Sequence, residues 1–407
     1  MHRIDHSTAV AGLFVPSDAQ LGQAATQLTP DWCNDLQESI AHVIESTGGA
    51  LIKNDYTQLS DGIAAIARNE GVGASNLLFN AGFTIWQRGT SRVFPVTDNL
   101  GDFGADRWHG EAGDGSGAAT FALGTHATPG PDGERYYGQW NQTGSSTSVR
   151  PHISQEIEDV RRHAGKTFAL QFRVALTSGT TVITPKLLQD FGSGGSADVL
   201  TDLGAVTLTG GSTFTTYTVT GTVPSISGKT IGAGSFLSVQ LTMDTGATYT
   251  VQFDRVQFQE GFATAFEIVP LVDDLRRCQR YFFKTYPEGY TPGAGANNSG
   301  ALITRQFVQT GEPFGSLGDI IYGGLNLLFP VPMRAAPTVI WWNPNDGTEG
   351  EIFRETVESS PTNSNFSPAN SVGTSYLQTG PPRTTSTAIL NKYHQLRAHV
   401  TADAEFL

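Results

Sequence analysis

Two segments of the chain alternate between large apolar residues and small or polar ones, and this period of two limits the fold more than any other feature. In 167–174 a large apolar side chain occupies every even-numbered position, and in 249–253 every odd-numbered one. Such alternation is typical of a half-buried strand. The pattern resumes at Val256 and Phe258 with its phase shifted by one residue. That shift predicts a β-bulge within the second strand.

The composition agrees with an all-β protein whose strands are joined by turns. Of the 407 residues, 47 are glycine, 20 are proline and only 15% are charged. The net charge of −13 argues against nucleic-acid binding, which needs a basic face. The densest basic cluster, Arg276, Arg277 and Arg280, falls on an expected helix and is interpreted as a solvated or interface face.

The sequence predicts neither a signal peptide nor a membrane-spanning segment. No apolar stretch approaches the 18 or more residues of a membrane span, and residues 1–15 do not have the pattern of a signal peptide. The two cysteines are far apart and suggest neither a disulfide framework nor a zinc site. We therefore expect folding in the cytoplasm and no membrane insertion.

The first seventy residues differ from the rest, because they predict two short helices. Thr29-Pro30-Asp31 has the residue types of a helix start, and a second helix is expected from Asn54 or Asp55 to just before Gly71. Each helix has an apolar stripe, which packs either against the other helix or, as we favour, against copies of the chain or another protein. The residues expected to serve in attachment or oligomerisation are Trp32, Leu36, Ile40, Val43, Ile44, Leu59 and Ile63.

The predicted fold class is mainly β, with a short N-terminal helical region followed by two β-sandwich modules of jelly-roll type joined by a helix. The expected linker helix, Asp273 to Lys284, places Leu275, Cys278 and Phe282 on one face. The expected divisions are 1–72 for the helical region, 73–270 for the jelly roll, 271–285 for the linker helix and 286–407 for the C-terminal sandwich.

Sequence motifs of catalysis are not found, so we expect no enzymatic activity. Asp102, Asp106, Asp114 and Asp132 lie in glycine-rich loops. Such carboxylates could bind calcium or form the acid pair of a glycosidase, but acidic loop residues are more often turn formers. No cofactor is expected, and the sequence leaves a metal site unknown.

Sugar recognition would use exposed aromatic rings, which cover the apolar faces of pyranoses beside polar groups that bind the hydroxyls. Tyr136-Tyr137 and Trp341-Trp342 are adjacent pairs, so in a strand their two rings point to opposite faces. One ring of each pair is expected to face outward, and core packing is the alternative for every tryptophan. The candidate carbohydrate- or receptor-binding residues are Trp341, Trp342, Asn343, Tyr376, Trp108, Tyr136, Tyr137 and Trp140.

Short segments in chain order resemble the tail-fibre proteins of tailed bacteriophages. Those similar to the virion-attachment end are Met1–Asp5, Thr29–Glu38 and Asp55–Leu59. Those similar to a carbohydrate-module-like jelly roll are Asn76–Phe83 and Trp86–Gly89, then Phe253-Asp254, Val256-Gln257, Gly261 and Ala263–Glu267. Those similar to the following helix and the C-terminal module are Cys278–Phe282, Phe329–Thr338 and Thr401–Glu405.

The resemblance implies a virion structural protein and no enzyme. It implies a homotrimeric tail fibre, assembled in the host cytoplasm, that joins tail or baseplate proteins through its N-terminus and presents its β modules to a host surface glycan. Host contact is then expected in 285–407, and a structural calcium ion is possible at Asp254. The alternatives are a head-decorating or baseplate virion protein without a receptor role, and a carbohydrate-binding module of a larger system.

Overall fold

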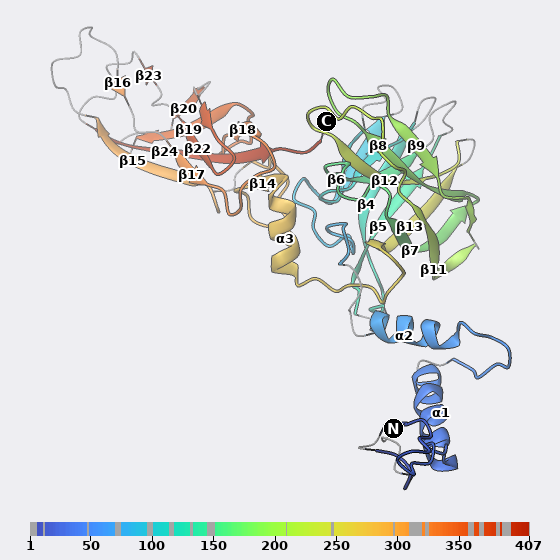
Figure 1. Ribbon diagram of the computed structural model, residues 1–407. Coiled ribbons are helices and arrows are strands. Elements are labelled where there is room, and N and C mark those ends of the chain that lie inside the picture. Colours follow the sequence, from blue (N-terminus) through green and yellow to red (C-terminus); the bar gives the residue numbers. More distant parts are fainter. Residues whose placement is uncertain are drawn as a thin grey trace. The chain divides into compact units, whose positions relative to one another are not determined.

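The computed structural model divides the chain into two compact units (Figure 1). The first unit comprises Met1–Ala74 with Ala263–Phe266, and the second comprises Ser75–Phe262 with Glu267–Leu407. The described residues are 6–10, 13–46, 49–69, 75–95, 101–113, 118–130, 133–144, 151–208, 210–245, 248–295, 298–308, 320–321, 325–356, 362–365, 370–379, 383–384 and 392–406.

The first unit contains the two predicted helices, α1 (Pro30–Glu45) and α2 (Gln58–Asn69). Thr29 caps α1, because its hydroxyl accepts a hydrogen bond from the Trp32 backbone N–H, 3.3 Å away. The second helix begins later than predicted, because Asp55 accepts bonds from the Thr57 N–H and hydroxyl and closes a turn before the helix. Among the described residues, no helix is both long and apolar enough to cross a bilayer.

The second unit begins with a β-sandwich of two antiparallel sheets, and this confirms the mainly β prediction. The first sheet has the strand order β1-β4-β5-β13-β7-β11, with bounds β1 (Ser91–Pro95), β4 (Ala118–Thr125), β5 (Tyr136–Gln142), β13 (Tyr249–Glu260), β7 (Thr167–Gly179) and β11 (Gly211–Thr222). The second sheet has the order β10-β8-β12-β6-β3-β2, with β9 also paired to β8, and its bounds are β10 (Val206–Thr207), β8 (Val182–Asp190), β12 (Phe236–Thr242), β6 (His152–Glu158), β3 (His109–Glu111), β2 (Asp102–Phe103) and β9 (Val199–Asp202).

The inner faces of these two sheets share one apolar core. Phe121, Trp140 and Phe172 come from the first sheet, and Leu187 and Leu241 come from the second; all are buried. The even-numbered apolar positions of 167–174 are among the buried core residues, as the alternation predicted. Burial of these large side chains is the main source of stability in such a sandwich.

The predicted bulge lies in β13. The register of β13 against β7 shifts between Phe253 and Arg255, so Asp254 has no register partner on β7. The bulge makes the phase of the apolar positions change while Phe253 and Val256 both stay in the core. It also leaves two consecutive charged residues, Asp254 and Arg255, between the core positions Phe253 and Val256.

The C-terminal module is organised around one long strand, β24 (Lys392–Asp403). It pairs with β14 (Phe282–Lys284), β15 (Leu302–Val308), β18 (Thr338–Trp342) and β19 (Glu351–Thr356). The remaining strands are β20 (Thr362–Asn365), which pairs β19; β16 (Ile320–Ile321), which pairs β23 (Arg383–Thr384); and β17 (Asn326–Leu328), β22 (Tyr376–Thr379) and β21 (Asn370–Val372), which form a three-stranded sheet.

The predicted linker helix is shorter than expected. Helix α3 spans Leu271–Gln279, and Phe282–Lys284 is a strand that pairs with Thr401–Asp403 of β24. The prediction of helix through Lys284 was therefore wrong, because pairing with a distant strand outweighs the local helical pattern. Cys278 is buried, as that helix face predicted.

Charged side chains join the jelly roll to the end of β24 at a place that we call the junction, formed by Arg88, Arg107, Asp403 and Glu405. Arg107 forms an ion pair with Glu405, and both side chains are only 1% exposed. Arg88 lies 2.9 Å from Asp403 and 3.6 Å from Glu405. Buried ion pairs of this kind are costly to break, because removing one partner leaves the other charge unpaired.

Aromatic rings also lie at the junction. The guanidinium of Arg107 lies over the Tyr281 ring, 3.6 Å from its centroid. Phe406 packs against Phe236 of the jelly roll at a centroid distance of 5.1 Å and against the Arg334 guanidinium at 3.9 Å. The two β modules therefore share a contact from which water is excluded, and they are not connected by the linker helix alone.

Candidate functional site

Polar side chains on β5 and β13 meet on the outer face of the first sheet. Gln139 is the register partner of Gln252, and Asn141 is the register partner of Thr250. All four are half-buried and point away from the core, because the alternate positions of both strands carry the core residues. We call these four side chains together with Tyr137, which precedes them on the same face of β5, the amide face.

Hydrogen bonds between the strands fix the orientation of these groups. The Gln252 side-chain NH₂ donates to the Gln139 carbonyl Oε1 at 2.9 Å, and the Thr250 hydroxyl donates to Asn141 Oδ1 at 3.0 Å. This leaves the NH₂ groups of Gln139 and Asn141 as donors and the Gln252 carbonyl oxygen as an acceptor. The amide face thus presents donors and an acceptor in fixed positions and carries no charge of its own.

Other aromatic rings gather around Tyr137 at one end of the amide face. Tyr137, His126 and Phe214 form a cluster with ring centroids 5.0 Å apart for the two pairs that include His126 and 6.0 Å apart for Tyr137 and Phe214. Gly124 makes room for the Tyr137 ring, because a Cβ at that position would lie 2.0 Å from the ring. The half-buried Tyr137 ring is therefore held against β4.

Paired charges lie beside this aromatic cluster. Arg173 forms an ion pair with the buried Asp254, and Arg255 forms one with Glu134. Burial raises the pKa of Asp254 to about 7 although Arg173 opposes the shift. Burial, with the two guanidinium groups, lowers the pKa of His126, so its ring is neutral at pH 7.

The surroundings of Asp254 do not fit the calcium ion that the resemblance suggested. A calcium ion takes six to eight oxygen ligands. Asp254 instead faces the Arg173 guanidinium and lies 3.3 Å from His126 Nε2. Within the described parts of the chain, no group of three or more His, Cys, Asp or Glu side chains is placed to hold a metal ion.

Two of the tryptophans proposed for sugar binding are core residues. Trp108 and Trp140 are both fully buried. The Trp108 indole N–H donates to the Asn80 backbone carbonyl at 2.9 Å, and the Trp140 ring stacks on Phe94 at a centroid distance of 5.4 Å. Neither ring can contact a sugar in this fold, so the core alternative applies to both.

The candidates in the C-terminal module do not form one site. Trp341 and Asn343 are buried, Trp341 in the module core and Asn343 beneath a turn where its side chain accepts a bond from the Asn345 N–H at 2.9 Å. Trp342 points the other way, as predicted for adjacent strand residues, but its ring covers Gly293 and its N–H donates to the Thr401 hydroxyl at 3.1 Å. Burial makes Trp341 and Asn343 structural, whereas Trp342 is half-buried and held by these two contacts.

Tyr376 and Tyr136 are the two sequence candidates that are most exposed. Tyr376 is 44% exposed and lies beside Leu328, its register partner on β17. It belongs to the three-stranded sheet and not to the sheet of Trp341. Tyr136 is exposed at the start of β5, whereas Tyr137 lies on the amide face. Of the eight candidates, Tyr137 alone is placed beside the aligned amides.

The loop aspartates also have structural partners where they are described. Asp102 pairs with Arg92. Asp106 is buried and accepts a bond from the Gln87 N–H at 2.9 Å. Asp114 and Asp132 lie outside the described residues. In the described part of the chain, Asp102 and Asp106 thus have separate partners.

The apolar stripes of the first unit are only partly covered. The two helices approach each other at Gly62, where a Cβ would lie 3.0 Å from the Val43 carbonyl oxygen. Ile44 is buried, but Leu59 is 37% and Ile63 is 55% exposed. The other predicted attachment residues are half-buried or at the edge of exposure, namely Trp32, Leu36, Val43 and Ile40.

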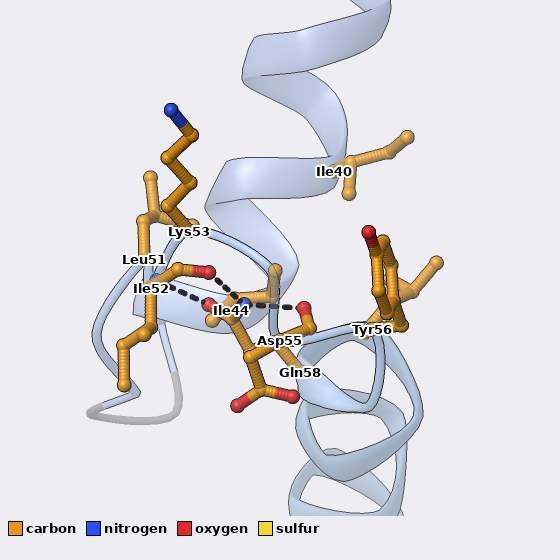
Figure 2. Close-up of a pocket in the computed structure, with 9 residues that line it drawn as sticks. Ile40, Ile44, Leu51, Ile52, Lys53, Asp55, Tyr56 and Gln58 are labelled. Atoms are coloured by element: carbon orange, nitrogen blue, oxygen red, sulfur yellow. Dashed lines mark hydrogen bonds between the residues drawn. The ribbon is translucent and has the colours of Figure 1, made fainter.

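An apolar pocket of about 370 Å³ lies between the end of α1 and the start of α2 (Figure 2). We call it the helix pocket; its lining residues are Ile40, Ile44, Leu51, Ile52, Lys53, Asp55, Tyr56, Gln58 and Leu59. The Gln58 side chain bonds both backbone groups of Ile52, at 2.7 and 2.6 Å, and so fixes the connecting loop against α2.

Sequence reasoning missed Gln139, Asn141, Thr250 and Gln252. A signal was present, because positions 139 and 141 of one segment and 250 and 252 of the other alternate with apolar residues or glycine and are uncharged amides and a hydroxyl. What the sequence does not show is that β5 and β13 are neighbours, since the bonded residues Gln139 and Gln252 are 113 positions apart.

Comparisons with known proteins find no matching protein-family model and no matching curated protein. Among solved structures, the enzymatically active domain of bacteriophage CBA120 tailspike protein 4 is similar at 14% identity and a TM-score of 0.30, over 46% of this chain and 21% of that one. The xylan-binding domain CBM22-1 of Paenibacillus barcinonensis is similar at 15% identity and a TM-score of 0.29, over 47% of this chain and 98% of that one.

A cyclase from Fischerella sp. TAU is similar to the same degree, at 16% identity and a TM-score of 0.31, over 47% of this chain and 99% of that one. The neighbours thus include a tailspike domain, a carbohydrate-binding module and a cyclase. Similarities this low carry no argument about function, which must come from the site itself.

Proposed function

We propose that the protein is a non-catalytic virion component, a homotrimeric tail fibre that binds a host surface glycan through the amide face of its jelly roll. It is assembled in the host cytoplasm and joins other tail or baseplate proteins through its first unit. The segments similar to tail-fibre proteins support the virion role. The amide face supports glycan binding.

The observation that carries the glycan proposal is the pair of oriented side-chain bonds on the amide face. A sugar hydroxyl both donates and accepts, so it is matched by a surface where amide donors and an acceptor alternate. The bonds between Gln139 and Gln252, and between Asn141 and Thr250, hold these groups before a ligand arrives. Little side-chain entropy is then lost on binding. The Tyr137 ring supplies the apolar surface that a pyranose face needs.

This proposal moves the expected glycan contact from residues 285–407 to the jelly roll. The reason is burial, because Trp341 and Asn343 cannot reach a ligand. Tyr376 is exposed, but Leu328 and not an amide pair lies opposite it. These observations favour the jelly roll as the module that carries the proposed sugar site.

We expect Gln252→Ala to weaken glycan binding about tenfold, because it removes one acceptor and also releases Gln139 from its fixed orientation. Tyr137→Ala should weaken binding by a similar factor through loss of the ring contact. The measurement is binding of the full chain to an array of bacterial surface polysaccharides, followed by titration of the strongest binder.

Two matched variants serve as controls for this experiment. Gln240→Ala removes a half-buried glutamine from β12 of the other sheet, and Tyr136→Ala removes the neighbouring tyrosine. Both should bind as the unchanged chain does. A chain that binds none of the polysaccharides, or four variants that bind equally well, would contradict the proposed site.

Deletion of residues 1–72 is expected to prevent incorporation into phage particles while leaving the second unit folded. The apolar residues of the helices belong to neither of the two hydrophobic cores of the second unit, so the β modules do not depend on them. Incorporation is measured by immunoblotting of purified particles, with circular dichroism as the folding check. Normal incorporation of the deleted chain would contradict the attachment role.

A further inference from the structure

The helix pocket has an apolar wall and a polar rim. Its apolar lining residues are Ile40 and Ile44 of α1, Leu59 of α2, and Leu51 and Ile52 of the connecting loop. In the single chain Leu51, Ile52 and Leu59 remain exposed to water. Exposed apolar groups gathered around a cavity are typical of a surface that another segment covers.

The rim of the helix pocket carries acidic side chains. Asp55 lines the pocket and is fully exposed, and the two bonds from Thr57 lower its pKa, so it is charged at pH 7. The Thr57 hydroxyl also lies 3.1 Å from a carboxylate oxygen of Asp61, which brings a second acid to the start of α2. Lys53 is the one cation among the lining residues that the structure describes.

The charge of the whole first unit has the same sign. Residues 1–74 contain three Lys and Arg against nine Asp and Glu, which gives −6 of the chain's −13 in less than a fifth of its length. Two copies of this unit would repel each other when brought into contact through such surfaces. A segment that fills the apolar pocket and carries positive charge would instead be attracted.

We propose that the helix pocket binds an apolar segment flanked by Lys or Arg residues that belongs to a different protein, and not a second copy of this chain. The inference rests on the proposed attachment role of the first unit and states the chemistry of the partner. Apolar side chains of the partner enter between Ile40, Leu51 and Leu59. Its basic residues lie against Asp55 and Asp61.

The probes for a test are two synthetic peptides of about 14 residues with the same leucine positions, one with lysine and one with glutamate at every polar position. Their binding to the full-length chain is measured by fluorescence anisotropy. We expect the lysine peptide to bind at least about tenfold more tightly than the glutamate peptide, and added salt to reduce this difference.

Pocket variants separate specific binding from general attraction to an acidic surface. Leu59→Gln should weaken binding of the lysine peptide about tenfold, because it removes part of the apolar wall without changing the charge. Asp55→Asn should weaken it severalfold. Leu21→Gln changes an exposed leucine of the same unit that does not line the pocket, and it should have no effect.

Three results would overturn the inference. The first is equal binding of both peptides, and the second is lysine-peptide binding that Leu59→Gln does not change. The third is concentration-dependent self-association in analytical ultracentrifugation that Leu59→Gln abolishes, because the occupant would then be a second copy. Any of these would leave the attachment role standing if deletion of residues 1–72 still prevents incorporation.

Discussion

Glu405→Ala is expected to lower the free energy of unfolding of the second unit by about 3–5 kcal/mol. The variant leaves the Arg107 guanidinium, which is 1% exposed, without its charge partner in a place that water does not reach. Arg107 keeps its bond to the Glu156 backbone carbonyl, at 2.6 Å, but a neutral acceptor does not balance a buried charge. Chemical denaturation of the full chain gives the value.

The pH and the controls decide how this result is interpreted. Burial raises the pKa of Glu405 to about 7, so the experiment belongs above that pH, where the carboxylate is charged. Asp403→Ala removes a side chain that is 36% exposed and should cost less, about 1 kcal/mol. The double variant Arg107→Met, Glu405→Leu should recover most of the loss. A loss below about 1 kcal/mol for Glu405→Ala would show that the junction does not depend on this pair.

Trp108→Ala should destabilise the jelly roll by about 3–5 kcal/mol, because it removes a fully buried ring and leaves a cavity. The ring packs against Phe83 at a centroid distance of 4.9 Å. Its N–H bonds the carbonyl of Asn80, whose own side chain binds the backbone of Ile85 and Asp106. The midpoint of thermal unfolding reports the change.

Comparison with Tyr137→Ala on the amide face shows whether the loss of stability is specific to the buried Trp108. Tyr137→Ala should change stability by about 1 kcal/mol or less, because the ring is half-buried, while it weakens glycan binding. Trp108→Phe keeps most of the buried volume and should cost less than the alanine variant. Loss of glycan binding by Trp108→Ala with unchanged stability would instead support the sequence-based assignment of this tryptophan to a sugar site.

Local patterns in the sequence predicted the elements whose causes are local. The capping threonine at 29 and the proline after it predicted the start of α1, and the phase shift between Phe253 and Val256 predicted the bulge in β13. Each depends on residues that are close in the chain. The mainly β class follows from the same alternation, because period two fixes which side chains share a face.

Features that depend on distant partners were not predictable in this way. Phe282–Lys284 has a helical pattern, but it is a strand because β24 lies beside it. The amide face has the same origin, since the Gln139 side chain is oriented by Gln252 of β13, which the local pattern cannot place beside it. The tryptophans were predicted to bind sugar because of their residue type, whereas their burial depends on the packing of the whole sandwich.

The junction also has a consequence for the order in which the protein is made. Arg107 and Glu405 are 298 residues apart. At about 5–20 residues per second, a ribosome completes the segment of Arg107 about 15–60 s before it reaches the carboxylate. During that interval Arg107 has no carboxylate from the C-terminal end to pair with, so we expect its guanidinium to stay hydrated. Loss of water from Arg107 is therefore a late event in biogenesis, and a nascent chain of this protein exposes an incomplete surface to chaperones until β24 has emerged.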